Sequence, residues 1–289
     1  MKTKVITIIS IICSLSLSAV AVAQDDALLE RGTYLMEGIL ACENCHTPKD
    51  PETHAEIRSM AFAGANVLSD EAHTPYAPNI TMDVETGIGS WTDEEIITAM
   101  RDGLRPDGTI IGPPMPSPGF YATMSDNDVR AVVAYLRTVE PVNNVVPKST
   151  YNFPLPPNYG PKVESVAEPD RSDPIAYGKY VTESLGHCGA CHTPLGEGGL
   201  DFSRHNAGGQ VFANLFGFNM TAVSLNITPH PTAGIGEWTD EEIKRAITKG
   251  ISRDGRELAK VMAFSYYDKI NDEDLDAMVA YLRALPPIQ

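Results

Sequence analysis

The chain has 289 residues, of which 38 are acidic and 22 basic, and its formal net charge is −16. So large an excess of negative charge disfavours binding to nucleic acids and to anionic membrane surfaces, and it favours partners with basic patches. The length exceeds that of one small domain and suits two domains of roughly 130 residues each.

The first residues have the order of a secretory signal peptide. Lys2 and Lys4 precede an apolar run over residues 5–13, and small residues follow up to Ala23. This order predicts a cleavable signal peptide over residues 1–23 and export to the periplasm. An uncleaved membrane anchor is the alternative, but the apolar run is shorter than the roughly 20 residues of a spanning helix. No later segment is long and apolar enough, so we expect no transmembrane segment in the mature chain.

Two CxxCH pentapeptides follow, at residues 42–46 and 188–192. In this motif the two thiols add to the vinyl groups of a haem, and the histidine becomes the proximal ligand of the iron. We therefore predict two covalently bound c-type haems. Their attachment and ligand residues are Cys42, Cys45 and His46 for the first haem, and Cys188, Cys191 and His192 for the second.

A zinc ribbon and a thioredoxin-like redox pair are the alternative interpretations of this spacing. A zinc ribbon places two CxxC pairs roughly 15–20 residues apart, and a thioredoxin-like motif lies within a βαβ pattern. Neither context surrounds the two motifs. The fifth cysteine, Cys13, lies in the predicted signal peptide, so the motifs use every cysteine of the mature chain.

The two motifs belong to two copies of one unit. A shift of 146 residues superposes the pentapeptides, and a shift of 147 superposes residues 79–81 on 226–228 and residues 91–96 on 238–243. The extent of this match indicates an internal duplication.

We place the first domain at residues 24–139 and the second at residues 175–289. The stretch between them, residues 140–174, is rich in proline, which favours a semi-rigid, extended connector. We expect this linker to lie along the domains.

The pattern within each copy is helical. Capping boxes at residues 92–95 and 239–242 start one helix in each copy. A second, amphipathic helix follows Ser125 or Asn271 as its polar cap, with apolar residues at i, i+3, i+4 and i+7. Strand signals are weak, so the expected fold class is all-α. The apolar positions are Val129, Val132, Val133 and Leu136 in the first copy and Leu275, Met278, Val279 and Leu282 in the second.

A haem iron takes a second protein ligand in electron carriers and keeps an open position in many enzymes. Of the ten methionines, only Met115 and Met262 are related by the repeat shift. Met115 lies in a proline-rich loop that can hold a weakly binding thioether against iron, whereas Met262 has no flanking prolines. We predict both as distal ligands, although a lone methionine is more often a core residue. The other methionines are expected in the core or in loops.

The remaining histidines have no histidine counterpart in the other copy and are expected at the surface. His187, next to Cys188, could instead tune the second haem. The histidines concerned are His54, His73, His187, His205 and His230.

Two further pairs of equivalent residues are candidate haem-pocket contacts. The indole N–H groups of Trp91 and Trp238 could bind haem propionates, and packing of a helix start is the alternative. Asn79 and Asn226 match the glycosylation sequon. Their recurrence in a haem-binding repeat favours a hydrogen bond that fixes a loop.

One order of motifs occurs twice in the chain: CxxCHTP, NIT, GIG-x-WTDEEI, DG, a methionine loop and a helix ending in Ala-Tyr-Leu-Arg. It resembles the class I cytochrome c domain, and in particular the cytochrome subunits of bacterial periplasmic alcohol, aldehyde and gluconate dehydrogenase complexes. The resemblance implies His/Met ligation of both irons and electron transfer from a dehydrogenase towards quinone or a terminal oxidase. Those subunits often have a third haem motif and a C-terminal membrane-associating segment. This sequence has neither, so the resemblance does not extend to membrane attachment or to quinone reduction by this chain alone.

The leading interpretation is thus a dihaem electron carrier of a respiratory chain, with no catalytic residues of its own. The alternative is a dihaem enzyme, such as a peroxidase or a thiosulfate-oxidising cytochrome, which needs an open or unusually ligated iron. The similar plan of the two copies argues against one specialised copy.

Overall fold

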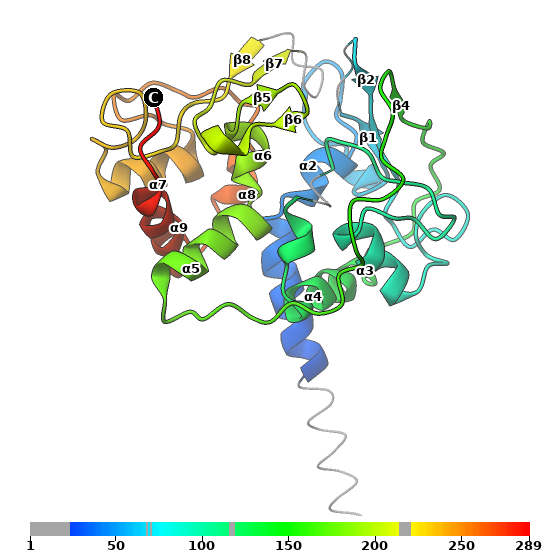
Figure 1. The fold of residues 1–289 in the computed structure, drawn as a ribbon. Helices are drawn as coiled ribbons and strands as arrows, with labels where there is room; N and C mark the ends of the chain where they lie inside the picture. Colours follow the sequence, from blue (N-terminus) through cyan, green and yellow to red (C-terminus); the bar gives the residue numbers. More distant parts are fainter. Residues whose placement is uncertain (1–23, 68, 70, 116–118, 214–220) are drawn as a thin grey trace, which may run out of the picture.

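The computed structural model describes residues 24–67, 69, 71–115, 119–213 and 221–289 (Figure 1). The predicted signal peptide lies outside the described residues. Within them, no helix combines the length and the apolar character needed to cross a membrane.

The first copy begins with a helix over residues 24–37 and ends with the helix α4 (Asp126–Leu136). These two helices cross each other. The crossing is close, because a β-carbon at Gly32 would overlap the carbonyl oxygen of Ala131. Its other elements are α2 (Cys42–His46), η1 (Arg58–Met60), β1 (Ala65–Asn66), β2 (His73–Thr74), β3 (Tyr76–Ala77), α3 (Asp93–Arg101), η2 (Tyr121–Thr123) and α4 (Asp126–Leu136).

The second copy repeats this plan, and Gly178 meets Ala277 as Gly32 meets Ala131. A π-helical turn, η3, extends its first helix. Its elements are α5 (Pro174–Lys179), η3 (Tyr180–Leu185), α6 (Cys188–His192), β5 (Leu195–Gly196), β6 (Gly199–Leu200), η4 (Phe202–Arg204), β7 (Val211–Ala213), β8 (Thr221–Val223), α7 (Asp240–Lys249), α8 (Phe264–Tyr267) and α9 (Asp272–Ala284).

The helix starts are as predicted. Thr92 and Thr239 each form a complete capping box, and Ser125 and Asn271 cap α4 and α9 through their side chains. All eight predicted apolar positions on these last two helices are buried. The strands form antiparallel pairs of two or three residues per strand, so the predicted all-α class is confirmed.

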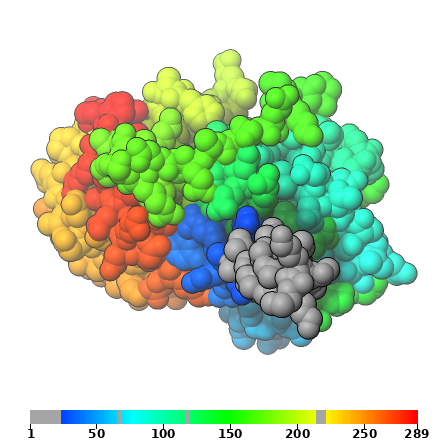
Figure 2. All heavy atoms as spheres, turned by 90° about the horizontal axis from the view of Figure 1, so that it is seen from below, coloured from blue at the N-terminus to red at the C-terminus, as the bar shows by residue number. Residues whose placement is uncertain are grey.

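The two copies of the repeat share one apolar core. Leu35 and Leu40 of the first copy lie in the same cluster as Val181, Leu185 and Met278 of the second, and all five are at most 2% exposed. Seen from below, the N-terminal helix lies between the two copies (Figure 2). Direct packing therefore fixes their relative position.

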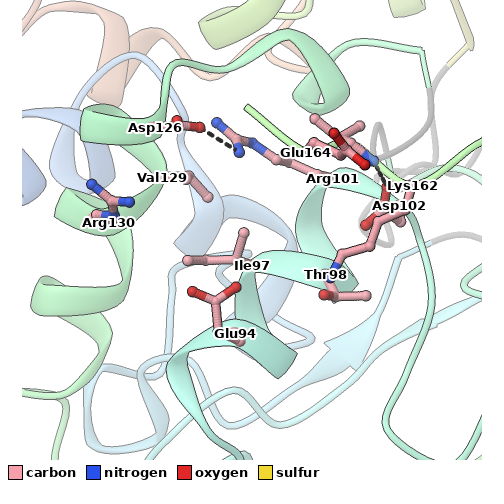
Figure 3. A pocket seen from close by; sticks show the side chains of 11 residues that line it. Glu94, Ile97, Thr98, Arg101, Asp102, Asp126, Val129, Arg130, Lys162 and Glu164 are labelled. Carbon is pink, nitrogen blue, oxygen red and sulfur yellow. Dashed lines mark hydrogen bonds and ion pairs between the residues drawn. The ribbon is translucent and has the colours of Figure 1, made fainter. Parts of the chain in front are cut away.

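The linker lies along the first copy, as predicted. Its strand β4 (Thr150–Tyr151) pairs with β2, and the Tyr159 hydroxyl donates to the Ile111 carbonyl at 2.9 Å. A pocket of about 310 Å³ remains between α3, α4 and linker residues 162–164, beside the Arg101–Asp126 ion pair (Figure 3). No residue of either CxxCH motif lines this pocket, and we assign it no function.

Candidate haem-binding sites

Each CxxCH motif forms a short helix that begins after a strained residue. Ala41, before α2, has φ of 48°, and His187, before α6, has φ of 40°. Residues with a side chain rarely adopt this left-handed conformation, which persists where the surrounding structure enforces it, often at functional sites. The same strained turn thus precedes the first cysteine in both copies.

The four thiols form no disulfide. Burial, the largest influence, raises the pKa of Cys42 and Cys45 to about 12 and that of Cys191 to about 11, and it also raises the pKa of Cys188. All four thiols are therefore protonated at neutral pH and are available for thioether bonds.

The motif histidines have the geometry of metal ligands. Nδ1 of His46 donates to the Pro78 carbonyl at 2.9 Å, and Nδ1 of His192 donates to the Leu225 carbonyl at 2.7 Å. This bond fixes the tautomer in which Nε2 carries the lone pair. Burial lowers the pKa of both rings, which keeps them neutral. The residues at both sites fit a covalently attached haem.

Met115 and Met262 are both half-buried and lie on the loop that precedes the last helix of their copy. Met115 packs against the shared core, and the residues that follow it, 116–118, lie outside the described residues. Ligation of iron by either sulfur stays a prediction. Four of the other methionines are core residues, as expected: Met36, Met100, Met124 and Met278. Met220 lies outside the described residues.

Asn79 and Asn226 fix loops, as expected. The Asn79 carbonyl oxygen accepts bonds from the backbone and hydroxyl of Thr81, at 2.9 and 2.7 Å, and its amide donates to the Val142 carbonyl at 2.8 Å. Asn226 makes the same bonds to Thr228 and Ile288. Both tryptophans, Trp91 and Trp238, pack against the cores. Contacts of these four residues with haem stay predictions.

Two tyrosines that the sequence analysis missed lie between the sites. The pKa of Tyr121 is raised by burial and, to a smaller extent, by the nearby Cys42 and Cys45 thiols and by Tyr267. The pKa of Tyr267 is raised by burial and by thiols of both copies, namely Cys188, Cys191 and Cys45. The two haem attachment points therefore face a common interior region. The repeat shift of 146 relates Tyr121 to Tyr267, so a search for shared tyrosines would have found the pair.

The five histidines expected at the surface are all half-buried, and two of them make contacts close to the sites. His187 packs edge-on against Tyr121, with ring centroids 5.7 Å apart, and burial lowers its pKa to about 4. The side chain of His205 is 24% exposed and hydrogen-bonded to Glu183. The internal duplication did not point to either histidine, because the other copy has no histidine at either position.

Comparison with known proteins agrees with the geometry. The cytochrome c family model matches residues 29–140 and again residues 175–286. The chain is 31% identical over 282 residues to the cytochrome c subunit of a quinone-dependent alcohol dehydrogenase from Gluconobacter oxydans, covering 91% of this chain and 56% of that protein. It is 29% identical over 288 residues to a gluconate 2-dehydrogenase cytochrome c subunit from Pantoea cypripedii, covering 93% and 63%.

The chain thus spans between about half and two thirds of those dehydrogenase subunits. A dihaem c-type cytochrome from Cereibacter sphaeroides is closer in length. It is 30% identical over 263 residues, which cover 86% of this chain and 83% of that protein. With two matched domains, each built around a CxxCH helix and a neutral, oriented histidine, this chain belongs to the cytochrome c family.

Proposed function

We propose that the protein is a periplasmic dihaem electron carrier that receives electrons from a dehydrogenase partner and passes them towards quinone or a terminal oxidase. The observation that carries the proposal is that both CxxCH helices lie in one packed body, with their thiols facing a common interior region. Because vinyl groups lie at the edge of the macrocycle, the cysteines mark the haem edges. Two edges held close together suit electron transfer through the protein.

Each haem would be held by the two cysteines of its motif and by His46 or His192, with Met115 or Met262 on the distal side. When bound, haem supplies an iron that cycles between two oxidation states. The protein would attach it through the cysteines of the motif, and the Nδ1 hydrogen bond would aim Nε2 of the histidine at the iron. A thioether ligand raises the reduction potential, and a six-coordinate iron has no position for a substrate.

The relatives suggest the electron donor. Their names describe cytochrome subunits of alcohol and gluconate dehydrogenases. We propose that a dehydrogenase of this general class docks on this acidic chain through a complementary basic patch. The signal peptide predicted over residues 1–23 directs the protein to the periplasm, where this encounter takes place.

The test uses the mature protein isolated from a host that attaches c-type haem. Intact mass should show two haems, and stopped-flow mixing with a reduced periplasmic dehydrogenase should show rapid reduction of both. Peroxide and thiosulfate should not be turned over. A turnover rate of order 10 s⁻¹, near the median for enzymes, would overturn the carrier in favour of the dihaem enzyme.

A further inference from the structure

An apolar surface of the second copy is exposed on the hairpin formed by β7 and β8. Val211 and Val223 are Cα partners across this hairpin, and they are 65% and 55% exposed. Leu225, two residues after Val223, is 46% exposed. We call these three residues the β7–β8 surface. Exposed apolar residues that gather in one place mark sites of interaction more often than single ones do.

The β7–β8 surface adjoins the second haem-attachment site. The Leu225 carbonyl accepts the hydrogen bond that orients the ring of His192. Gln210, directly before Val211, donates from its side-chain amide to the Ala190 carbonyl in α6 at 2.8 Å. The hairpin therefore lies against the attachment helix (Figure 1). A protein bound to this surface would be held close to the second haem.

The first copy has an equivalent hairpin, but there the valine is buried. The backbone amides of Gly64 and Gly208 each donate to the carbonyl of the motif histidine, at 2.7 and 2.6 Å. Val67 and Val211 each follow three residues later, so they are equivalent. Val67 is 4% exposed, far less than its counterpart.

An extended segment of the linker lies on this hairpin of the first copy. A β-carbon at Gly64 would lie 2.5 Å from Cγ2 of Val146. The Ser149 hydroxyl accepts from the Tyr76 amide at 2.9 Å and donates to the Tyr76 carbonyl at 3.2 Å, which closes the outer edge of β3. Tyr76 is the counterpart of Val223, because each stands two residues before the carbonyl that accepts the histidine bond. Protein, and not haem, thus occupies this place in the first copy.

The same edge is open in the second copy. Within the described part of the chain, β8 pairs with β7 and with no other strand. Hydrogen-bonded and non-hydrogen-bonded partners alternate along an antiparallel pair. The Ser224 amide donates to the Gln210 carbonyl on the β7 side at 2.9 Å, so the N–H and C=O of Val223 point away from β7. An open edge of this kind can pair with an extended segment of another chain.

Charge decides which chain fits. A second copy of this protein would bring another net charge of −16 to the contact, and like charges oppose that association. A partner with basic residues around an apolar segment is attracted instead. The dehydrogenase proposed above as the electron donor is a partner of this kind.

We propose that the β7–β8 surface is the docking site of the electron-donating dehydrogenase, which lays an extended segment along β8. Its apolar side chains contact Val211 and Val223, and basic residues surround them. This inference rests on the proposed function. Charge steers the encounter and governs the association rate, whereas the apolar contacts govern how long the complex lasts.

The double variant Val211→Thr, Val223→Thr tests this in the protein with both haems attached. Threonine keeps the branched shape of valine, so the strands and both haem sites should be preserved. Its hydroxyl weakens an apolar contact. The probe is the dehydrogenase that reduces the wild type in the stopped-flow test above. Its complex with the double variant should dissociate roughly tenfold faster, with an unchanged association rate, because less apolar surface is buried.

Val84→Thr is the matched control. Val84 belongs to the first copy and is 67% exposed, so it resembles Val211 in exposure but lies outside the β7–β8 surface. Its replacement should leave the dissociation rate unchanged. Val223→Lys is a second test, because a lysine on the edge strand repels a basic segment and hinders pairing. Wild-type dissociation rates in the double variant and in Val223→Lys overturn the proposal.

Two further measurements separate the possible outcomes. Sedimentation of the wild type as a dimer and of the double variant as a monomer would show that a second copy covers the surface, which also overturns the proposal. If the dehydrogenase reduces neither haem of the wild type, the proposed function fails. Normal reduction with unchanged dissociation in both surface variants sinks this inference alone.

Discussion

The hydroxyl of Tyr34, in the first copy, donates a 2.6 Å hydrogen bond to the Asp274 carboxylate of the second copy. The equivalent bond runs the other way, from Tyr180 to Asp128, also at 2.6 Å. The repeat shift of 146 relates both partners, so the two copies face each other with approximate two-fold symmetry. A third contact, between the hydroxyls of Thr123 and Ser184 at 2.7 Å, crosses the same boundary.

Replacing Tyr180 by phenylalanine should lower the free energy of unfolding by about 1.5–3 kcal/mol, the range for hydrogen bonds to charged groups. Asp128, which is 2% exposed, would lose a donor where water does not readily replace it. Urea denaturation of the holoprotein measures the change. Tyr159→Phe, which removes a bond from the linker to a carbonyl, is the control and should cost about 0.5–1.5 kcal/mol. Equal losses in the two variants would contradict a special role for the interface.

Met115→Ala should remove about half of the weak near-infrared band that arises from sulfur-to-iron charge transfer, and Met262→Ala the other half. Each variant should also lower the potential of one haem, because methionine ligation raises it. Met82→Ala, a half-buried methionine without a counterpart in the second copy, is the control. A full band in Met115→Ala would show that the repeat comparison chose the wrong ligand.

The protein should lose stability in mild acid through His187. Burial lowers the pKa of this ring from 6.5 to about 4, so between those values the unfolded chain binds more protons than the folded one. The free energy of unfolding should therefore fall by on the order of 2 kcal/mol between pH 7 and pH 5 from this group.

The variant His187→Asn isolates this contribution, since asparagine tolerates the left-handed backbone at this position. Its denaturation midpoint should depend less on pH than that of the wild type. The same pH dependence in both proteins would mean that other groups cause the acid sensitivity.

Reduction by the dehydrogenase should slow as salt is raised. The chain carries a formal charge of −16. Salt screens the attraction between this charge and a basic partner, because the Debye length falls to about 10 Å at 0.1 M salt. Stopped-flow association rates measured from low to high ionic strength check this. A rate that is independent of salt would point to an apolar docking surface.

The sequence by itself determined the features that depend on local chemistry. The CxxCH motifs, the capping boxes at Thr92 and Thr239 and the periodic apolar residues of the last helices act over a few residues, so spacing is enough to identify them. The duplication could be found because both copies have identical residues at the same intervals.

Only the tertiary structure decided how the copies meet and how they differ. Tyr34 and Asp274 are 240 residues apart, and no periodicity indicates that a side chain of one copy reaches into the other. The contacts of His187 and His205 could not be predicted for the same reason. A comparison of repeats highlights what the copies share, whereas the contacts of His187 with Tyr121 and of His205 with Glu183 involve histidines that the other copy lacks.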